Sequence, residues 1–159
     1  MNFERYCLDK ILNCLKGCIP YIKWESQISP NFWHGRFDLF GQYENNIYII
    51  ELEFKREDPA INVIKVYRAV DEKLQILDKT KVYFIHIFSD FFNFNKEKRI
   101  NAEFVGKKMS KEFSNLEYIS IDFNVAPPVR GDSFPSNTDI AIKSLYIKIE
   151  KLIKDLENI

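Results

Sequence analysis

Two expected β-strands and the turn that joins them fill residues 36–55, RFDLFGQYENNIYIIELEFK. Side chains alternate between the two faces of a strand, so Glu51, Glu53 and Lys55 share one face of the second strand. A central strand is ordinarily apolar on both faces, whereas here two carboxylates and an ammonium stand where burial is expected. These charges therefore indicate a candidate functional site at the end of the strand.

The turn decides which carboxylate faces Asp38 on the first of these strands. Asparagine tolerates the left-handed conformations of tight turns, so Asn45 and Asn46 are the expected loop residues. This register places Asp38 directly across from Glu53, with about 5 Å between the side chains. A four-residue loop would instead pair Asp38 with Glu51. In both registers Asp38 lies on the same face as the other acids.

The acids require a compensating cation. Like charges that face one another destabilise a sheet, and Lys55 supplies one positive charge to Asp38, Glu51 and Glu53. A hard divalent ion such as Mg²⁺ or Mn²⁺ could neutralise the negative charge that Lys55 leaves. Such an ion prefers carboxylate and carbonyl oxygens and keeps open positions for a substrate phosphate. Metal and phosphate chemistry are therefore expected at one site.

The flanking sequence predicts one helix before these strands and several helices and strands after them. Asp58 and Pro59 supply an N-cap and a proline at the first helical position. The apolar run from Val82 to Phe88 suits a buried strand that is reached by a parallel crossover. The expected helices are 2–17, 59–77, 96–111 and 138–156, and the expected strands are 21–28, 36–42, 47–55, 82–88 and 116–123. This is an α/β fold with a mixed central sheet flanked by helices, in which an α-β-β-β-α-β core is extended by a C-terminal strand and helix.

Length and composition restrict the class of protein. The 159 residues suit a single domain, 1–159, and a hydrophobic share of 46% excludes disorder of the whole chain. Basic and acidic residues number 23 each, so net charge gives no argument for a nucleic acid or a membrane as partner. Cys7, Cys14 and Cys18 all fall in the first expected helix, so reduced thiols are expected. Since neither a signal peptide nor an apolar run of membrane-spanning length is evident, we expect a cytoplasmic protein.

Asp38 and the triplet Glu53-Phe54-Lys55, within the α-β-β-β-α-β order of residues 1–90, resemble the PD-(D/E)xK nuclease superfamily. The resemblance implies a restriction-endonuclease-like fold and an endonuclease that hydrolyses DNA phosphodiester bonds with Mg²⁺ or Mn²⁺. It further implies that Asp38, Glu53 and the Phe54 carbonyl bind the metal. Lys55 would orient a nucleophilic water and stabilise developing charge.

Several residues leave the match to this family open to alternatives. Phe37 stands where the name of the family has proline. Glu51 adds an acid two residues before the expected one, so Glu51 could be the acid of the motif, with Glu53 in the position of the lysine. We favour Glu53 as the acid and Lys55 as the lysine. The family often adds an acid from the first helix, and Glu4 falls in the apolar sector of that helix. Glu51 and Glu4 are therefore further candidate metal ligands, although an exposed first-turn acid is the alternative for Glu4.

Five side chains are candidates for contacts with nucleic acid: His34, Lys65, Arg68, Lys107 and Lys108. The stretch 96–111 holds six basic and two acidic residues, which suits contacts to phosphates but also an ordinary solvated helix. His86 lies in an apolar strand and is expected to be a hydrogen-bonded core residue.

Two further expectations concern assembly and activity. Cutting both strands of a duplex needs two sites and a chain this short offers one, which makes a homodimer plausible. The alternative to an enzyme is a catalytically inactive nucleic-acid-binding or protein-interaction module on the same fold.

Overall fold

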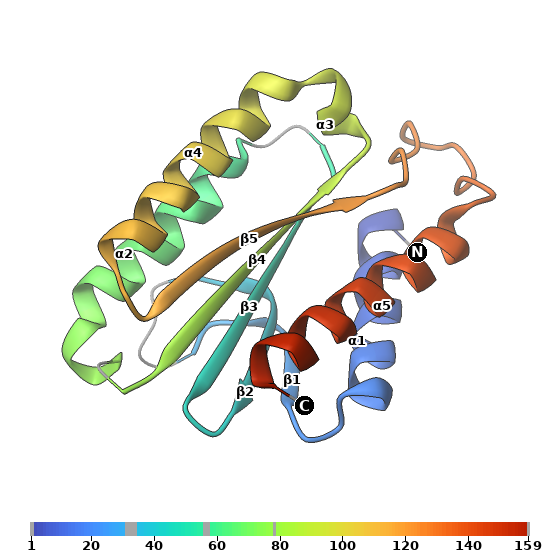
Figure 1. Ribbon diagram of the computed structural model, residues 1–159. Helices are drawn as coiled ribbons and strands as arrows, with labels where there is room; N and C mark the ends of the chain where they lie inside the picture. The colour runs from blue at the N-terminus through green and yellow to red at the C-terminus, as the bar shows by residue number, and fades with distance from the viewer. Residues whose placement is uncertain (1, 31–34, 56–57, 78, 159) are drawn as a thin grey trace.

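The computed structural model describes residues 2–30, 35–55, 58–77 and 79–158, which form a five-stranded sheet with the order β1-β2-β3-β4-β5 (Figure 1). Strand β2 is antiparallel to both of its neighbours, β1 and β3, whereas β3, β4 and β5 run parallel. The strands are β1 (Lys23–Ile28), β2 (Phe37–Tyr43), β3 (Asn46–Glu53), β4 (Lys81–Ser89) and β5 (Leu116–Phe123). The two parallel connections each pass through helices, as crossovers of this kind require.

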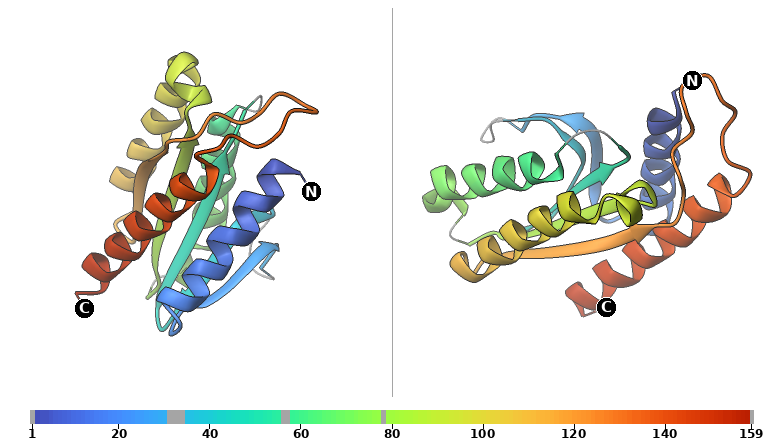
Figure 2. Two further views of the ribbon diagram at one scale, coloured as in Figure 1. Left: turned by 90° about the vertical axis from the view of Figure 1, so that its right-hand side faces the viewer. Right: turned by 90° about the horizontal axis from the view of Figure 1, so that it is seen from above.

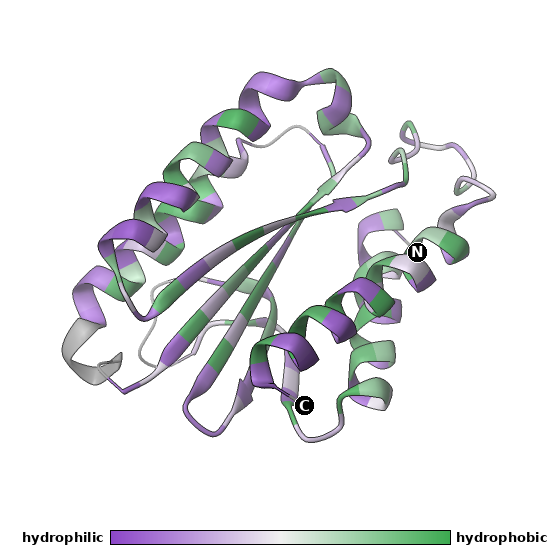
Figure 3. Cartoon of the chain, viewed as in Figure 1, coloured by the Kyte–Doolittle hydropathy of each residue, from purple (hydrophilic) through white to green (hydrophobic). Residues whose placement is uncertain are grey.

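Helices cover both faces of this sheet (Figure 2). They are α1 (Phe3–Cys18), α2 (Pro59–Leu77), the short α3 (Phe91–Phe94), α4 (Lys96–Glu112) and α5 (Thr138–Glu157). The buried side chains of α1 and α5 share one apolar cluster, and those of α2 and α4 share a second cluster on the opposite face. Apolar and polar bands alternate along α1 and α5, because only one side of each helix packs on the sheet (Figure 3).

Strand β3 contributes to both clusters by strict alternation. Tyr48 and Ile50 belong to the α1/α5 cluster, and Ile47 and Ile49 belong to the α2/α4 cluster. The same alternation carries Glu51 and Glu53 together onto the α2/α4 face, and it confirms the prediction that they share one face of the sheet. The element order and the mixed sheet confirm the predicted fold class, including the added C-terminal strand and helix.

The turn between β2 and β3 lies one residue earlier than predicted. Tyr43 pairs with Asn46, so the loop residues are Glu44 and Asn45, and the predicted Asn45-Asn46 loop is wrong. Glu44 adopts the left-handed conformation, with φ of 50°, that asparagine was expected to supply. This difference moves the facing partner of each β2 residue by two positions along β3.

Two other observations refine the sequence-based description. Strand β3 ends at Glu53, two residues earlier than predicted, so Lys55 has left the strand. Cys7, Cys14 and Cys18 are free thiols, as expected, and burial raises the pKa of Cys7 to about 12. Among the residues described, no helix combines the length and the apolar character needed to cross a bilayer.

Candidate active site

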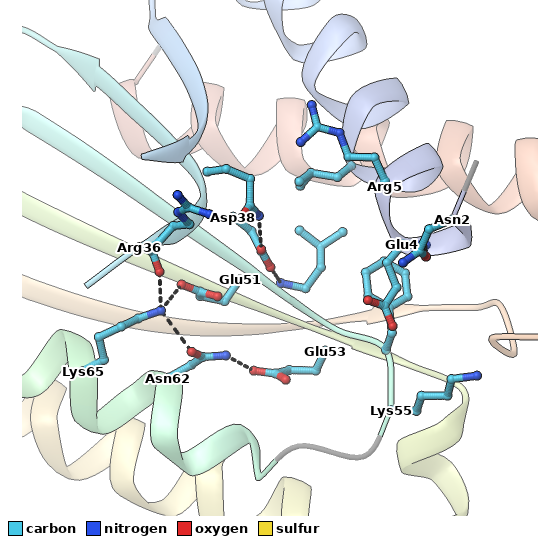
Figure 4. Close-up of a pocket in the computed structure, with 14 residues that line it drawn as sticks. Asn2, Glu4, Arg5, Arg36, Asp38, Glu51, Glu53, Lys55, Asn62 and Lys65 are labelled. Carbon is cyan, nitrogen blue, oxygen red and sulfur yellow. Dashed lines mark hydrogen bonds and ion pairs between the residues drawn. The ribbon is translucent and has the colours of Figure 1, made fainter. Parts of the chain in front are cut away.

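A cleft of about 460 Å³ is lined by residues of α1, β1, β2, β3 and α2 (Figure 4). The residues that were predicted for the site and that line this cleft are Glu4, Asp38, Glu51, Glu53, Phe54, Lys55 and Lys65. Five other polar residues line it without having been predicted: Asn2, Arg5, Gln27, Arg36 and Asn62. Side chains separated by more than 60 residues of sequence therefore meet at one end of the sheet.

The carboxylate of Asp38 is fixed by two hydrogen bonds. Its Oδ2 accepts from the backbone N–H of Leu52 at 2.9 Å, and its Oδ1 accepts from Nε2 of Gln27 at 2.8 Å. Gln27 has a left-handed backbone, with φ of 53°, a conformation that costs free energy in a residue other than glycine. Burial raises the pKa of Asp38, and the two hydrogen bonds counteract part of that effect. The local strain at Gln27 thus coincides with a bond that orients an acid of the cleft.

Glu51 faces Asp38 across the sheet. The paired ladder between β2 and β3 starts at Leu39 and Ile50, and Asp38 and Glu51 are the next facing positions. Glu51 is only 3% exposed, and burial raises its pKa to about 8. The charge of Asp38 acts in the same direction, whereas Lys65 lowers the pKa. Burial and Asp38 therefore favour the protonated form of Glu51, and a cation beside the carboxyl group favours the charged form.

That cation is the Lys65 ammonium from α2. Its Nζ lies 2.7 Å from Oε1 of Glu51, and it also donates to the Arg36 carbonyl at 2.6 Å and to Oδ1 of Asn62 at 3.0 Å. The ammonium lies over the Phe37 ring, 4.9 Å from its centroid. Lys65 was predicted as a contact to DNA, and in the structure it forms an ion pair inside the acid cluster.

Glu53 is held by a chain of buried and partly buried polar groups. Its Oε1 accepts from Nδ2 of Asn62 at 2.7 Å and lies 2.7 Å from Nε2 of His86. On the other side of the ring, Nδ1 of His86 lies 3.0 Å from the Tyr118 hydroxyl. A neutral His86 with its proton on Nε2 can donate to Glu53 and accept from Tyr118. His86 is fully buried and hydrogen-bonded, as predicted, and it also contacts the site.

The predicted lysine and backbone ligand have other partners in this structure. Nζ of Lys55 donates to the Pro128 carbonyl at 2.6 Å, and the side chain points away from the carboxylates (Figure 4). The Phe54 carbonyl accepts from Oγ of Ser89 at 2.6 Å. Glu4 lines the cleft from the first turn of α1, but it is exposed and not part of the apolar side of that helix. Register and side-chain direction therefore bring Glu51 and Lys65, rather than Lys55, next to Asp38.

The remaining candidates for nucleic-acid contacts lie elsewhere. Arg68 is exposed and pairs with Glu72 one turn along α2. Lys107 and Lys108 are exposed on α4 and are not among the described residues of the cleft. His34 lies outside the described residues. The arginines that do line the cleft, Arg5 and Arg36, carried no periodicity or motif that would have selected them.

The residue types of the cleft fit a hard divalent cation. Asp38, Glu51 and Glu53 offer carboxylate oxygens, which Mg²⁺ and Mn²⁺ prefer. Within the described part of the chain, however, no three Asp, Glu, His or Cys side chains are arranged to hold a metal ion as they stand. Each carboxylate has a protein partner instead, and at Glu51 that partner is the positive charge of Lys65. A metal ion bound to Oε1 of Glu51 would therefore have to take the place of the Lys65 ammonium.

No protein-family model matches the chain, and no curated protein matches it. Among solved structures, the chain is similar to the EndoMS–dsDNA2 complex, with 16% sequence identity and a TM-score of 0.47. The similarity covers 82% of this chain and 47% of that one, so this chain spans about half the length of its structural neighbour.

Proposed function

We propose that the protein is a metal-dependent deoxyribonuclease of the PD-(D/E)xK type that hydrolyses phosphodiester bonds within DNA. The observation that carries this proposal is the gathering of Asp38, Glu51 and Glu53 in one cleft that Arg5 and Arg36 also line. Carboxylates provide for a divalent cation, and arginines suit the phosphates of a nucleic-acid backbone.

In the proposed reaction, Asp38, Glu51 and Glu53 would hold Mg²⁺ or Mn²⁺. When bound, the ion would supply Lewis-acid chemistry, which polarises a phosphodiester and makes a bound water more acidic. Hydrolysis forms a bond between the water oxygen and phosphorus, breaks the bond from phosphorus to one sugar oxygen, and leaves a proton on that oxygen. The chain contributes fixed geometry, because the carboxylates of Asp38 and Glu53 are oriented by their own hydrogen bonds.

A second candidate function is a module that binds nucleic acid or protein without cutting it. The observation that favours it is the internal satisfaction of the acids, since Gln27, Lys65 and Asn62 already bond to them. The ion pair between Lys65 and Glu51 would then have a structural role within the acid cluster. The two candidates differ in whether metal enters the cleft and DNA is cleaved.

A homodimer forms part of the proposal for duplex substrates. The described part of the chain has one cleft with three carboxylates. Cutting both strands of a duplex therefore calls for two copies or for two successive events at one copy. Measurement of the molar mass with and without DNA would distinguish these possibilities.

The proposal is tested by incubating the protein with supercoiled plasmid, linear duplex, branched DNA, single-stranded DNA and RNA. Each substrate is supplied with Mg²⁺, with Mn²⁺ or with EDTA. We expect cleavage of at least one DNA substrate with metal, including nicking of the closed circle, and none with EDTA. Intact substrates under every metal condition would contradict the enzyme and favour the binding module.

A further inference from the structure

Two lysines line the cleft, and their surroundings differ. Lys65 meets Glu51 at 2.7 Å, whereas Nζ of Lys55 is bonded to the Pro128 carbonyl in the loop before α5. The Lys65 side chain is 19% exposed and its partner side chain is 4% exposed, so this ion pair is largely shielded from solvent. A pair in such surroundings interacts far more strongly than a pair on the surface.

The chain around Lys65 is shaped to admit its side chain. Gly35 has a φ of 127°, and a Cβ atom there would stand 2.6 Å from Cδ of Lys65. The ring of Phe37 lies beneath the ammonium, and Asn62, one turn earlier on α2, accepts one of its hydrogen bonds. Gly35, the Phe37 ring and the Asn62 amide thus fix the position of the Lys65 side chain and its ammonium group.

We infer that Lys65 acts as the internal counter-cation of the acid cluster, that a divalent metal ion displaces it from Glu51, and that its ammonium then serves the substrate phosphate in place of Lys55. This inference rests on the proposed nuclease function and assigns a residue to it.

Charge and geometry support the displacement. The ammonium occupies Oε1 of Glu51, one of the two oxygens through which this carboxylate could hold a divalent ion, and the like charges of lysine and metal repel one another. After displacement the ammonium would keep its other two acceptors, the Arg36 carbonyl and the Asn62 side chain, both at residues that line the cleft. It would therefore remain close to a bound phosphate, where a positive charge stabilises the charge that develops on the phosphate oxygens.

The test compares three lysine-to-methionine variants in metal binding and in cleavage. Lys65→Met removes the counter-cation, Lys55→Met removes the other lysine of the cleft, and Lys143→Met is the matched control on α5. Manganese binding is measured by calorimetry without DNA, and cleavage is measured at saturating Mn²⁺. Circular dichroism and urea unfolding establish that each variant is folded.

We expect Lys65→Met to bind Mn²⁺ roughly tenfold more tightly than the wild type, because it loses a competing positive charge. Its cleavage rate should fall by at least about a hundredfold, well below that of Lys55→Met, because it also loses the ammonium at the phosphate. Lys143→Met should equal the wild type in both measurements. If Lys65→Met does not fold, Lys65→Arg replaces it, with unchanged Mn²⁺ affinity and about tenfold slower cleavage expected.

The outcomes separate this inference from the proposed function. Wild-type cleavage together with an inactive Lys55→Met and an active Lys65→Met would overturn the inference and leave the nuclease intact. Weaker or unchanged Mn²⁺ binding by Lys65→Met would overturn the counter-cation role. A wild type that neither binds Mn²⁺ nor cleaves would overturn the proposed function, and the inference with it.

Discussion

Replacing Glu51 with glutamine should change how the stability of the metal-free protein depends on pH. Glu51 is 3% exposed, and its pKa is raised from an ordinary 4.5 to about 8 by burial and by Asp38. Between these two pH values the folded protein holds a proton that the unfolded chain has released. The free energy of unfolding should therefore fall as the pH rises through this range, and level off above it.

The size of the effect follows from the shift. One titrating group changes the free energy of unfolding by at most about 1.4 kcal/mol per pH unit, so the limit between pH 6 and pH 8 is about 3 kcal/mol. Glutamine cannot titrate, so Glu51→Gln should lose most of this slope and exceed the wild type in stability at pH 8. Asp38, whose pKa is also raised, adds a slope of the same sign that remains in the variant.

Urea unfolding in EDTA at pH 6, 7 and 8 measures this difference for the wild type and for Glu51→Gln. The matched control is Glu25→Gln on β1, which removes one negative charge from a pair at the surface. The control should follow the wild-type slope. Parallel pH curves for the wild type and Glu51→Gln would refute the reasoning, because they would mean that Glu51 does not take up a proton on folding.

Three other variants test features of the fold that support the cleft. Tyr48→Phe should leave the free energy of unfolding in urea unchanged or raise it by up to about 1 kcal/mol, because the buried Tyr48 hydroxyl has no hydrogen-bond partner among the described residues. A clear loss of stability in this variant would contradict that reading. His86→Phe should lower the free energy of unfolding by about 2–3 kcal/mol in the same assay, because Glu53 and Tyr118 each lose a hydrogen-bond partner. A decrease below about 0.5 kcal/mol would mean that these hydrogen bonds contribute little to stability. Gly35→Ala should lower the free energy of unfolding by about 1–2 kcal/mol, because Gly35 has a positive φ and lies close to the Lys65 side chain. A variant as stable as the wild type in urea unfolding would contradict this packing.

Much of the fold could be predicted from local signals in the sequence. The proline at the start of α2, the apolar run of β4 and the alternation along β3 are each determined by residues close together in the chain. The same alternation correctly placed Glu51 and Glu53 on one face of the sheet. Periodicity is a property of residues close together in the chain, so it can be recognised without knowledge of the tertiary structure.

The partners of the acids could not be predicted in this way. The register depended on Glu44 taking a left-handed conformation that asparagine ordinarily favours, and that one residue decided whether Glu51 or Glu53 faces Asp38. The ion pair of Lys65 joins α2 to β3, and only the packing of the helix on the sheet reveals it. One signal was available, since Asn62 and Lys65 are polar residues three apart on a helix and so share a face.

The direction of Lys55 was equally hidden from the sequence. Alternation put it on the face of the acids, but β3 ends at Glu53 and the chain turns before reaching it. Its hydrogen bond to Pro128 comes from a loop 73 residues later, which no local pattern connects to it. A short motif can therefore identify the right strand and still leave the direction of its lysine side chain unpredicted.

The most direct test of the account is the cleavage of supercoiled plasmid by the wild type and by Asp38→Asn in Mg²⁺, with Asp155→Asn on α5 as the matched control. Asparagine keeps the shape of Asp38 but removes its charge, and losing several kcal/mol of metal-dependent stabilisation corresponds to a rate reduced about a hundredfold or more. The account predicts nicking by the wild type and by Asp155→Asn, and none by Asp38→Asn or in EDTA. Equal nicking by Asp38→Asn and the wild type would contradict it.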